Sequence, residues 1–342
     1  MRGRGALNVT VAAISTATLL AVVFALRSFR VFPATRIQKN GSYSTLSPRT
    51  KLHSEIVKQI FLVREESVYR YFEDWVDPFI NSLGTFVPVQ TLSYSSATKT
   101  TFTDGDVILV LQQTSGFRVQ SAGEYWFMNT EGTDKRFAED AIDNGFNNII
   151  DFTLKGVERL SRHGAKQVLW LPITQAPGLP VYLPRTHLCM IGPANTPRRV
   201  KFMNALRAYI SNLEERVDFK HVEGWSVARA FESQQCSLVV HVSSTEVNSL
   251  AARLRLDILW LYNIPVISES AFEPDVSEYQ GTMKFVNLSS LVEETINTWR
   301  TVRSKNKTKD PFIEYTKRLE VLKIREERFR ETIRAVLHVN RV

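Results

Sequence analysis

The chain has 342 residues, 44% of them hydrophobic with 20 Phe and 6 Trp, which is enough apolar material for one large or two medium globular domains and excludes a disordered protein. Its formal net charge is +8, but eight of the 43 basic residues precede the first acidic residue, Glu55, and the other 35 face 35 acidic residues. The body of the chain therefore has no excess positive charge to attract a polyanion, and we predict no nucleic-acid partner.

Residues 6–26 form an uncharged run of 21 residues, which as a helix is long enough to cross the hydrocarbon core of a membrane. We expect residues 1–30 to supply a cytosolic end and a signal-anchor helix, and residues 31–54, rich in Ser, Thr, Arg and Lys, to form a flexible stem. Basic residues on both sides of the run leave its orientation open. A cleaved signal peptide is the alternative, whereas an organelle transit peptide would need an amphipathic pattern that the run lacks.

After the apolar run, three sequons, at Asn40, Asn287 and Asn306, could accept glycans if the body of the chain is translocated. The two cysteines, Cys189 and Cys236, could pair, but each stands in an apolar, strand-like context in which a buried free thiol is the commoner outcome. The sequence therefore predicts no disulfide framework.

In the first half of the chain, β-branched apolar runs alternate with segments of helical periodicity. The predicted strands are residues 55–63, 85–92, 106–113, 124–130, 147–152 and 166–173. The predicted helices are residues 65–83, 134–145 and 154–164, the last closed by Gly164. Such alternation with nearly continuous apolar strands is typical of a parallel sheet covered on both faces.

A proline-rich segment, residues 174–185, separates this unit from a second one of the same kind. Its predicted strands are residues 187–192, 218–225, 236–244, 265–270 and 281–287. Its predicted helices are residues 198–215, 226–235, 249–263 and 288–303, followed by a charged terminal helix over 311–337. The fold class is thus α/β, with two tandem doubly wound, Rossmann-like domains over 55–180 and 181–305, a C-terminal helix within 306–342, and a ligand cleft between their carboxyl-end loops.

Two local motifs suggest a charged ligand. Asp104-Gly105-Asp106 resembles a metal-binding D-x-D string, but it precedes a strand instead of following one, which favours a turn. In "MIGPANTPRR", Gly192 follows a strand, and Arg198 and Arg199 begin a helix, which suits a diphosphate site or a solvated basic helix start. His241, at a strand end, is either a cleft residue or a structural histidine.

The stretch "LAARLRLDILWLYNIPVISES", Leu250 to Ser270, resembles the second half of GT-B glycosyltransferases, in which a helix carrying an arginine precedes a "G-x-P-V-V-S-E"-like strand. "EYWFMNTEGTD", "NNIIDFTLKGVERL" and "VLWLPI" are similar to an "N-T-E-Q … D-Y-S … L-P" succession of some compact glycosyltransferases. The resemblance covers roughly Ile108 to Trp299. It departs from the wider group in lacking an obvious glycine-glycine loop and the E-x7-E signature, so the stereochemistry of transfer stays open.

The resemblance implies a nucleotide-sugar donor whose diphosphate is held without a metal, by Arg198, Arg199 and Arg255 and the backbone from Gly192 to Asn195. We expect His241 and Ser268 to belong to the same donor site. Glu269 would accept hydrogen bonds from ribose hydroxyls or cap the next helix. Trp225 would face the base of the nucleotide, and Arg229 would add positive charge to the site. The alternative for either residue is packing or a solvated surface position.

On the acceptor side, an inverting enzyme needs a general base from the first domain. Glu131, just past a strand in "MNTEG", is the candidate, with Asn129 as a positioning group and Asp151 as the second choice. A strand-end turn with a capping carboxylate is the alternative for both acids.

Together these features predict a glycosyltransferase of GT-B architecture that acts on a glycan, protein or lipid hydroxyl, a single-pass type II protein of the Golgi or ER membrane with a lumenal body. A non-catalytic two-domain ligand-binding or scaffold protein is the alternative. An acyl- or sulfotransferase is disfavoured, because the sequence lacks a G-x-S-x-G elbow and a phosphate loop.

Overall fold

The computed structural model describes most of the compact unit that begins at His53. The described residues are 57–112, 117, 119–130, 137–174, 186–192, 194, 196–223, 235–243, 253–262, 264–270, 278–279, 283–304 and 315–339. The predicted anchor and stem lie outside these ranges. Within them, the helices are all too short or too polar to serve as a transmembrane span.

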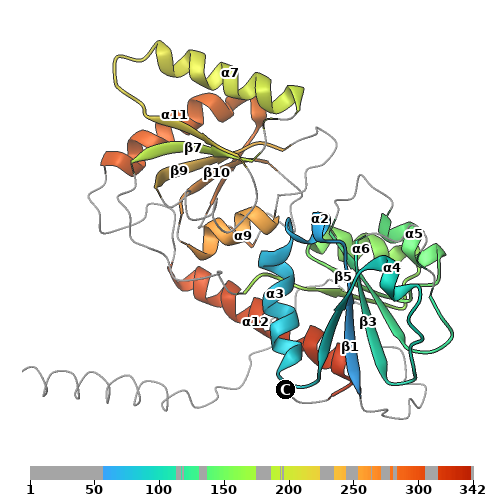
Figure 1. Cartoon of the computed structure of the whole chain (residues 1–342). Coiled ribbons are helices and arrows are strands. Elements are labelled where there is room, and N and C mark those ends of the chain that lie inside the picture. The colour runs from blue at the N-terminus through green and yellow to red at the C-terminus, as the bar shows by residue number, and fades with distance from the viewer. Residues whose placement is uncertain are drawn as a thin grey trace, which may run out of the picture. The chain divides into compact units, whose positions relative to one another are not determined.

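The first sheet is built from six parallel strands in the order β2-β1-β3-β4-β5-β6 (Figure 1). The strands are β1 (Gln59–Val63), β2 (Val89–Leu92), β3 (Asp106–Leu111), β4 (Glu124–Asn129), β5 (Asn148–Asp151) and β6 (Gln167–Trp170). The helices between them are α2 (Glu66–Tyr69), α3 (Glu73–Gly84), α4 (Tyr94–Ala97), α5 (Phe137–Asp143) and α6 (Leu154–His163).

Both faces of this sheet are buried. Side chains alternate between the two faces along each strand, and both sets pack against other elements. In β3, Val107 and Leu109 pack with α3 and with the last helix, α12 (Tyr315–Leu337). Ile108 and Val110 pack on the opposite face with α4, α5 and α6. This explains why β3 is apolar at every position after Asp106.

The second sheet has five parallel strands in the order β11-β10-β9-β7-β8. The strands are β7 (His187–Ile191), β8 (Phe219–Val222), β9 (Cys236–His241), β10 (Val266–Glu269) and β11 (Lys284–Val286). Helices α7 (Pro197–Ser211) and α11 (Leu288–Ser304) cover one face, and α9 (Arg253–Leu261) covers the other (Figure 1).

These two sheets confirm the α/β class and fit the two-domain arrangement of a GT-B enzyme. The domain boundaries proposed from the sequence stay predictions. The predicted helix over 65–83 is wrong as a single element, because a turn at Arg70–Phe72 divides it into α2 and α3. The short helix α4 was not predicted. The predicted helix over 226–235 lies almost wholly outside the described residues.

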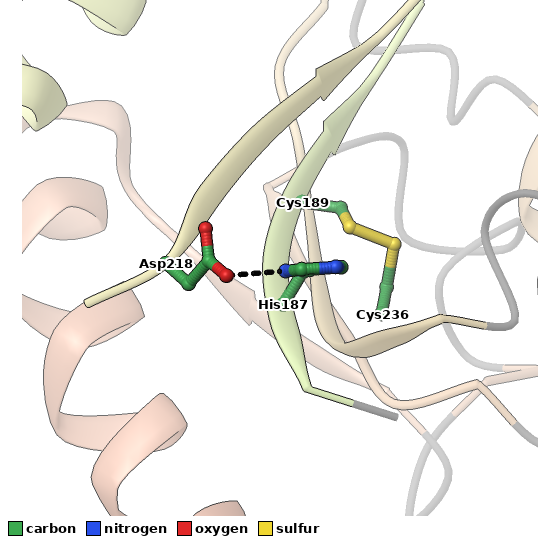
Figure 2. Close-up of a disulfide and its surroundings, with 4 residues drawn as sticks. All are labelled: His187, Cys189, Asp218 and Cys236. Atoms are coloured by element: carbon green, nitrogen blue, oxygen red, sulfur yellow. Dashed lines mark ion pairs between the residues drawn. A yellow bond between two sulfur atoms is a disulfide. The ribbon is translucent and has the colours of Figure 1, made fainter. Parts of the chain in front are cut away.

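The expectation of free thiols is wrong. Cys189 on β7 and Cys236 on β9 form a disulfide, with Cα atoms 5.6 Å apart (Figure 2). Their burial was predicted correctly. The bond is possible because β9 lies directly beside β7, and Cys236 lies opposite His187, two residues before Cys189, where the register of the two strands shifts. Beside the disulfide, His187 Nδ1 lies 2.9 Å from Asp218 Oδ2 (Figure 2).

The D-x-D string forms a turn, as its position before a strand favoured. Gly105 has a φ of 91°, and the carboxylate of Asp106 accepts hydrogen bonds from the backbone N–H and the hydroxyl of Thr103, at 2.7 and 2.9 Å. Asp106 therefore fixes the entry into β3.

Candidate anion-binding site

The carboxyl ends of β7, β9 and β10 meet at one edge of the second sheet, because these three parallel strands are neighbours. Gly192 follows β7, Val242 and Ser243 follow β9, and Glu269 ends β10. This edge of an open parallel sheet is the usual place for a phosphate-containing ligand. The predicted donor-site residues that the structure describes all lie there or contact it.

The start of α7 is determined by its local sequence. The hydroxyl of Thr196 accepts a hydrogen bond from the backbone N–H of Arg199 at 3.3 Å, and Pro197 occupies the first turn, where its missing N–H has no cost. Both arginines consequently belong to the first turn of the helix, and their side chains reach the ends of β9 and β10.

Arg198 makes a bidentate ion pair with Glu269. Its Nη1 lies 2.6 Å from Glu269 Oε2, and its Nη2 donates to Oε1. Nη1 also donates to the carbonyl of Ser243, and the backbone N–H of Ser243 donates to Glu269 Oε2 at 3.1 Å. Glu269 therefore holds the start of α7 to the ends of β9 and β10.

Arg199 and Arg255 are buried cations that donate to backbone carbonyls. Arg199 Nε donates to Val242 O at 3.0 Å, and Arg255 Nη1 donates to Ile191 O at 3.0 Å. Burial, followed by the neighbouring arginine in each case, lowers the pKa of both guanidinium groups, that of Arg255 by more. The surroundings of these two side chains thus disfavour positive charge.

Gly192 explains how Arg255 comes so close to the strand end. Its φ is 112°, in the left-handed region that favours glycine, and a Cβ at this position would lie 2.4 Å from Arg255 Nη1. The guanidinium of Arg255 lies directly over the glycine Cα. Any side chain at position 192 would push it away.

His241 ends β9 and is 1% exposed. Its Nδ1 lies 3.0 Å from the hydroxyl of Ser268, which itself donates to Glu269 O at 3.1 Å. Because the hydroxyl has one proton, it accepts from Nδ1–H, and the lone pair of the neutral ring is on Nε2. Nε2 has no hydrogen-bond partner among the described residues. Burial, then Arg255 and Arg199, lower the pKa of His241 well below its usual value, so the ring is neutral.

The first sheet presents a different group at the ends of β4 and β5. Asp151 is fully buried; its Oδ2 accepts from Asn129 Nδ2 at 2.6 Å, and its Oδ1 accepts from the backbone N–H and hydroxyl of Thr153 at 2.7 and 2.9 Å. Thr153 in turn caps α6 by accepting from Gly156 N at 2.9 Å. This is the geometry of the capping alternative for Asp151, and it favours that role over a general base.

Three predicted site residues, Glu131, Trp225 and Arg229, lie outside the described residues, as does Asn195 at the end of the predicted backbone loop. Sequence reasoning missed two groups that hold the site together. Thr196 carries a recognisable signal, a Thr-Pro pair at a helix start. Ser243 contributes through its backbone, for which the sequence has no signal.

No protein-family model and no curated protein sequence matches the chain. Among solved structures it is similar to TarM, with 11% identity, a TM-score of 0.46, and coverage of 72% of this chain and 56% of TarM. It is also similar to an α1,3-fucosyltransferase, at 15% identity and a TM-score of 0.44, covering 84% of this chain and 93% of that one. A third similar structure is the glycotransferase of kitacinnamycin, with 8% identity, a TM-score of 0.40, and coverage of 81% of this chain and 96% of that one. The chain thus spans just over half the length of TarM, and the contacts of its own residues decide what the site can bind.

Proposed function

We propose that this chain transfers a sugar from a nucleotide-sugar donor to a hydroxyl of a glycan, protein or lipid, and that Arg198, Arg199 and Arg255 bind the donor diphosphate. The observation that supports this function is the convergence of two helices on one sheet edge, where they bring these arginines and the buried His241 together. The positive end of the α7 dipole adds to the positive potential.

The charges of the site suit a diphosphate because burial makes them costly. Burial, followed by a neighbouring arginine (Arg198 for Arg199, and Arg199 for Arg255), lowers the pKa of both guanidinium groups and so destabilises their charged forms. A bound pyrophosphate group would relieve both effects. As the glycosidic bond breaks, negative charge grows on the leaving nucleoside diphosphate, and guanidinium groups fixed in a buried site stabilise that charge without reorganising. We propose that these arginines do the work that a divalent metal does elsewhere.

The finer parts of the proposal concern the acceptor and the cell. Glu131 is the proposed general base and Asn129 its positioning group, on the first-sheet side. We further propose a single-pass type II protein of the Golgi or ER membrane, anchored through residues 6–26, with a lumenal body. The Cys189–Cys236 disulfide supports that placement, because such bonds persist in oxidising compartments.

The test is ligand-induced stabilisation of the purified full chain by UDP, GDP, ADP and CMP at millimolar concentration, in EDTA and again with Mg²⁺ or Mn²⁺. A nucleotide present at 100 times its dissociation constant raises the free energy of unfolding by about 2.7 kcal/mol. We expect one nucleoside diphosphate to do so in EDTA. Arg255→Ala should abolish the effect, whereas Arg207→Ala, which removes an exposed arginine of the same α7, should not.

Turnover is tested separately, by following release of the nucleotide from the matching nucleotide sugars. Stabilisation without any release would favour the alternative of a ligand-binding protein. A chain that folds cooperatively but responds to none of the nucleotides would contradict the donor site itself.

A further inference from the structure

Another buried arginine, outside the anion site, contacts the other side of α9. Arg325 of α12 is fully buried. Its Nη2 lies 2.8 Å from Asp257 Oδ1 and 3.3 Å from Glu278 Oε2, and its Nη1 donates to the carbonyl of Ile173 at 3.4 Å. Four segments of the chain therefore meet at one guanidinium group.

Aromatic rings complete this cluster. The guanidinium of Arg325 lies over the ring of Trp260 at 4.5 Å and near that of Tyr279 at 5.5 Å. The hydroxyl of Tyr279 donates to Asp257 Oδ1, the same oxygen that Arg325 binds. Since Asp257 is 2% exposed, its charge depends on these donors and has no access to water.

Asp257 and Arg255 belong to the same helix and point away from each other. Two residues along an α-helix correspond to a rotation of about 200°, so they occupy opposite sides of α9. One side places Arg255 against Ile191 O and over Gly192. The other side places Asp257 against Arg325. Each side of α9 thus has a charged contact that restrains its rotation, and Arg318 of α12 adds a hydrogen bond to the carbonyl of Leu261 at 3.0 Å.

Helix α12 is itself fixed by the first sheet. The hydroxyl of Thr332 shares its proton between the carbonyl of Arg328 in the same helix, at 3.1 Å, and that of Trp170 at the end of β6, at 3.4 Å. Phe329 packs edge-on against Phe79 of α3, with ring centroids 6.1 Å apart. Arg325 therefore belongs to a helix that is held by contacts with the first sheet and α3. These contacts allow it to hold α9 in place.

We propose that Arg325 is a positioning residue of the donor site: through Asp257 it holds α9 at the rotation that puts the guanidinium of Arg255 over Gly192. This inference rests on the proposed function, because the value of placing Arg255 lies in the diphosphate that it binds. The contact at Gly192 leaves no room for adjustment, and a misplacement of about 1 Å at such a group can cost about 100-fold in function.

The experiment uses whichever nucleoside diphosphate stabilises the full-length wild type, UDP, GDP or ADP, and measures its Kd by calorimetry at a temperature where the variants compared are fully folded. The variants are Arg325→Met, Arg325→Lys and Asp257→Asn, with Tm measured for each. The matched control is Thr332→Val, which removes a buried hydrogen bond of the same helix that does not reach α9.

We expect Arg325→Met to weaken nucleotide binding at least tenfold, Arg325→Lys to restore part of the loss, and Asp257→Asn to resemble Arg325→Met. Thr332→Val should lower Tm and leave Kd unchanged. In the background of Arg255→Ala, adding Arg325→Met should weaken binding no further. Wild-type affinity of folded Arg325→Met for the nucleotide would overturn the positioning role. If Arg325→Met does not fold, wild-type affinity of both Arg325→Lys and Asp257→Asn would overturn it instead.

Hydrogen exchange of the α9 amides separates this inference from the proposed function. A wild type that binds no nucleotide would contradict the donor site, whereas exchange would still show whether Arg325 holds α9. We expect Arg325→Met to speed exchange in α9 by tenfold or more while the strands of the first sheet keep their protection. Unchanged exchange in α9 would overturn the inference whatever the nucleotide results.

Discussion

The Cys189–Cys236 disulfide closes a loop of 47 residues that contains α7 and therefore both Arg198 and Arg199. In the chain-entropy description, a cross-link over a loop of this length restricts the unfolded chain enough to stabilise the fold by about 4 kcal/mol. Both sulfur atoms are also buried in the core between the sheet and α9, so that truncating each cysteine to alanine removes about 1 kcal/mol of packing. We therefore expect Cys189→Ala and Cys236→Ala each to lose about 5 kcal/mol of unfolding free energy, and the double variant about 6 kcal/mol.

The double-mutant cycle makes this prediction specific. Either single substitution already removes the whole cross-link, so the two losses must not add, and their sum should exceed the loss in the double variant by about 4 kcal/mol. The assay is equilibrium urea unfolding without reductant, followed by tryptophan fluorescence. Alkylation of the denatured, unreduced wild type should label no thiol. Additive losses of about 1 kcal/mol each, with two thiols labelled in the wild type, would refute the reasoning.

Three further predictions concern individual side chains. Gly192→Ala should raise the Kd for the bound nucleotide at least tenfold by calorimetry, because the new methyl group overlaps the guanidinium of Arg255. Burial, followed by the neighbouring carboxylates, raises the pKa of Asp74 from 3.8 to about 7. The folded state therefore holds this proton more tightly than the unfolded chain does. The stability that this proton binding contributes is fully present below pH 3.8 and is lost as the pH rises through about 7. Asp74→Asn should therefore match the wild type near pH 4 and exceed it at pH 8 by up to about 4 kcal/mol in urea unfolding, and equal stabilities at pH 8 would contradict this. Asp151→Asn should lower the unfolding free energy by about 2 kcal/mol, since an amide cannot accept all the hydrogen bonds from Asn129 and Thr153, yet leave nucleotide affinity unchanged.

The order and type of most elements could be predicted because they depend on local periodicity. β3 is apolar on both faces, and α6 has a threonine cap and a terminal Gly164 with a φ of 106°. Each of these features can be recognised from a short stretch of consecutive residues. The break between α2 and α3 escaped prediction, because the apolar spacing continues through residues 70–72 and no Gly or Pro marks the turn. Pro78, the evident helix breaker nearby, lies inside α3 instead.

The contacts of the site were less predictable than its members. The sequence places Arg198 and Glu269 at a helix start and a strand end, but their pairing across 71 positions depends on which strands are neighbours. The same holds for the disulfide, whose formation required β9 to lie next to β7 with an irregular register. Arg325 gave no local signal, because a charged residue in a helix rich in Lys, Arg and Glu is expected to face solvent, and only tertiary packing buries it.

The three arginines of the site are not equivalent, and this difference suggests how a diphosphate would be received. The fork of Arg198 is engaged by the carboxylate of Glu269, so a phosphate would have to compete with an anion already in place. Arg199 and Arg255 donate to the backbone carbonyls of Val242 and Ile191, and burial, followed by a neighbouring arginine, lowers the pKa of each guanidinium group. In the proposed donor site, an incoming negative charge would gain most from these two groups. Arg198 and Glu269 together hold the start of α7 against the strand ends, and the affinity for the proposed diphosphate would reside chiefly in Arg199 and Arg255.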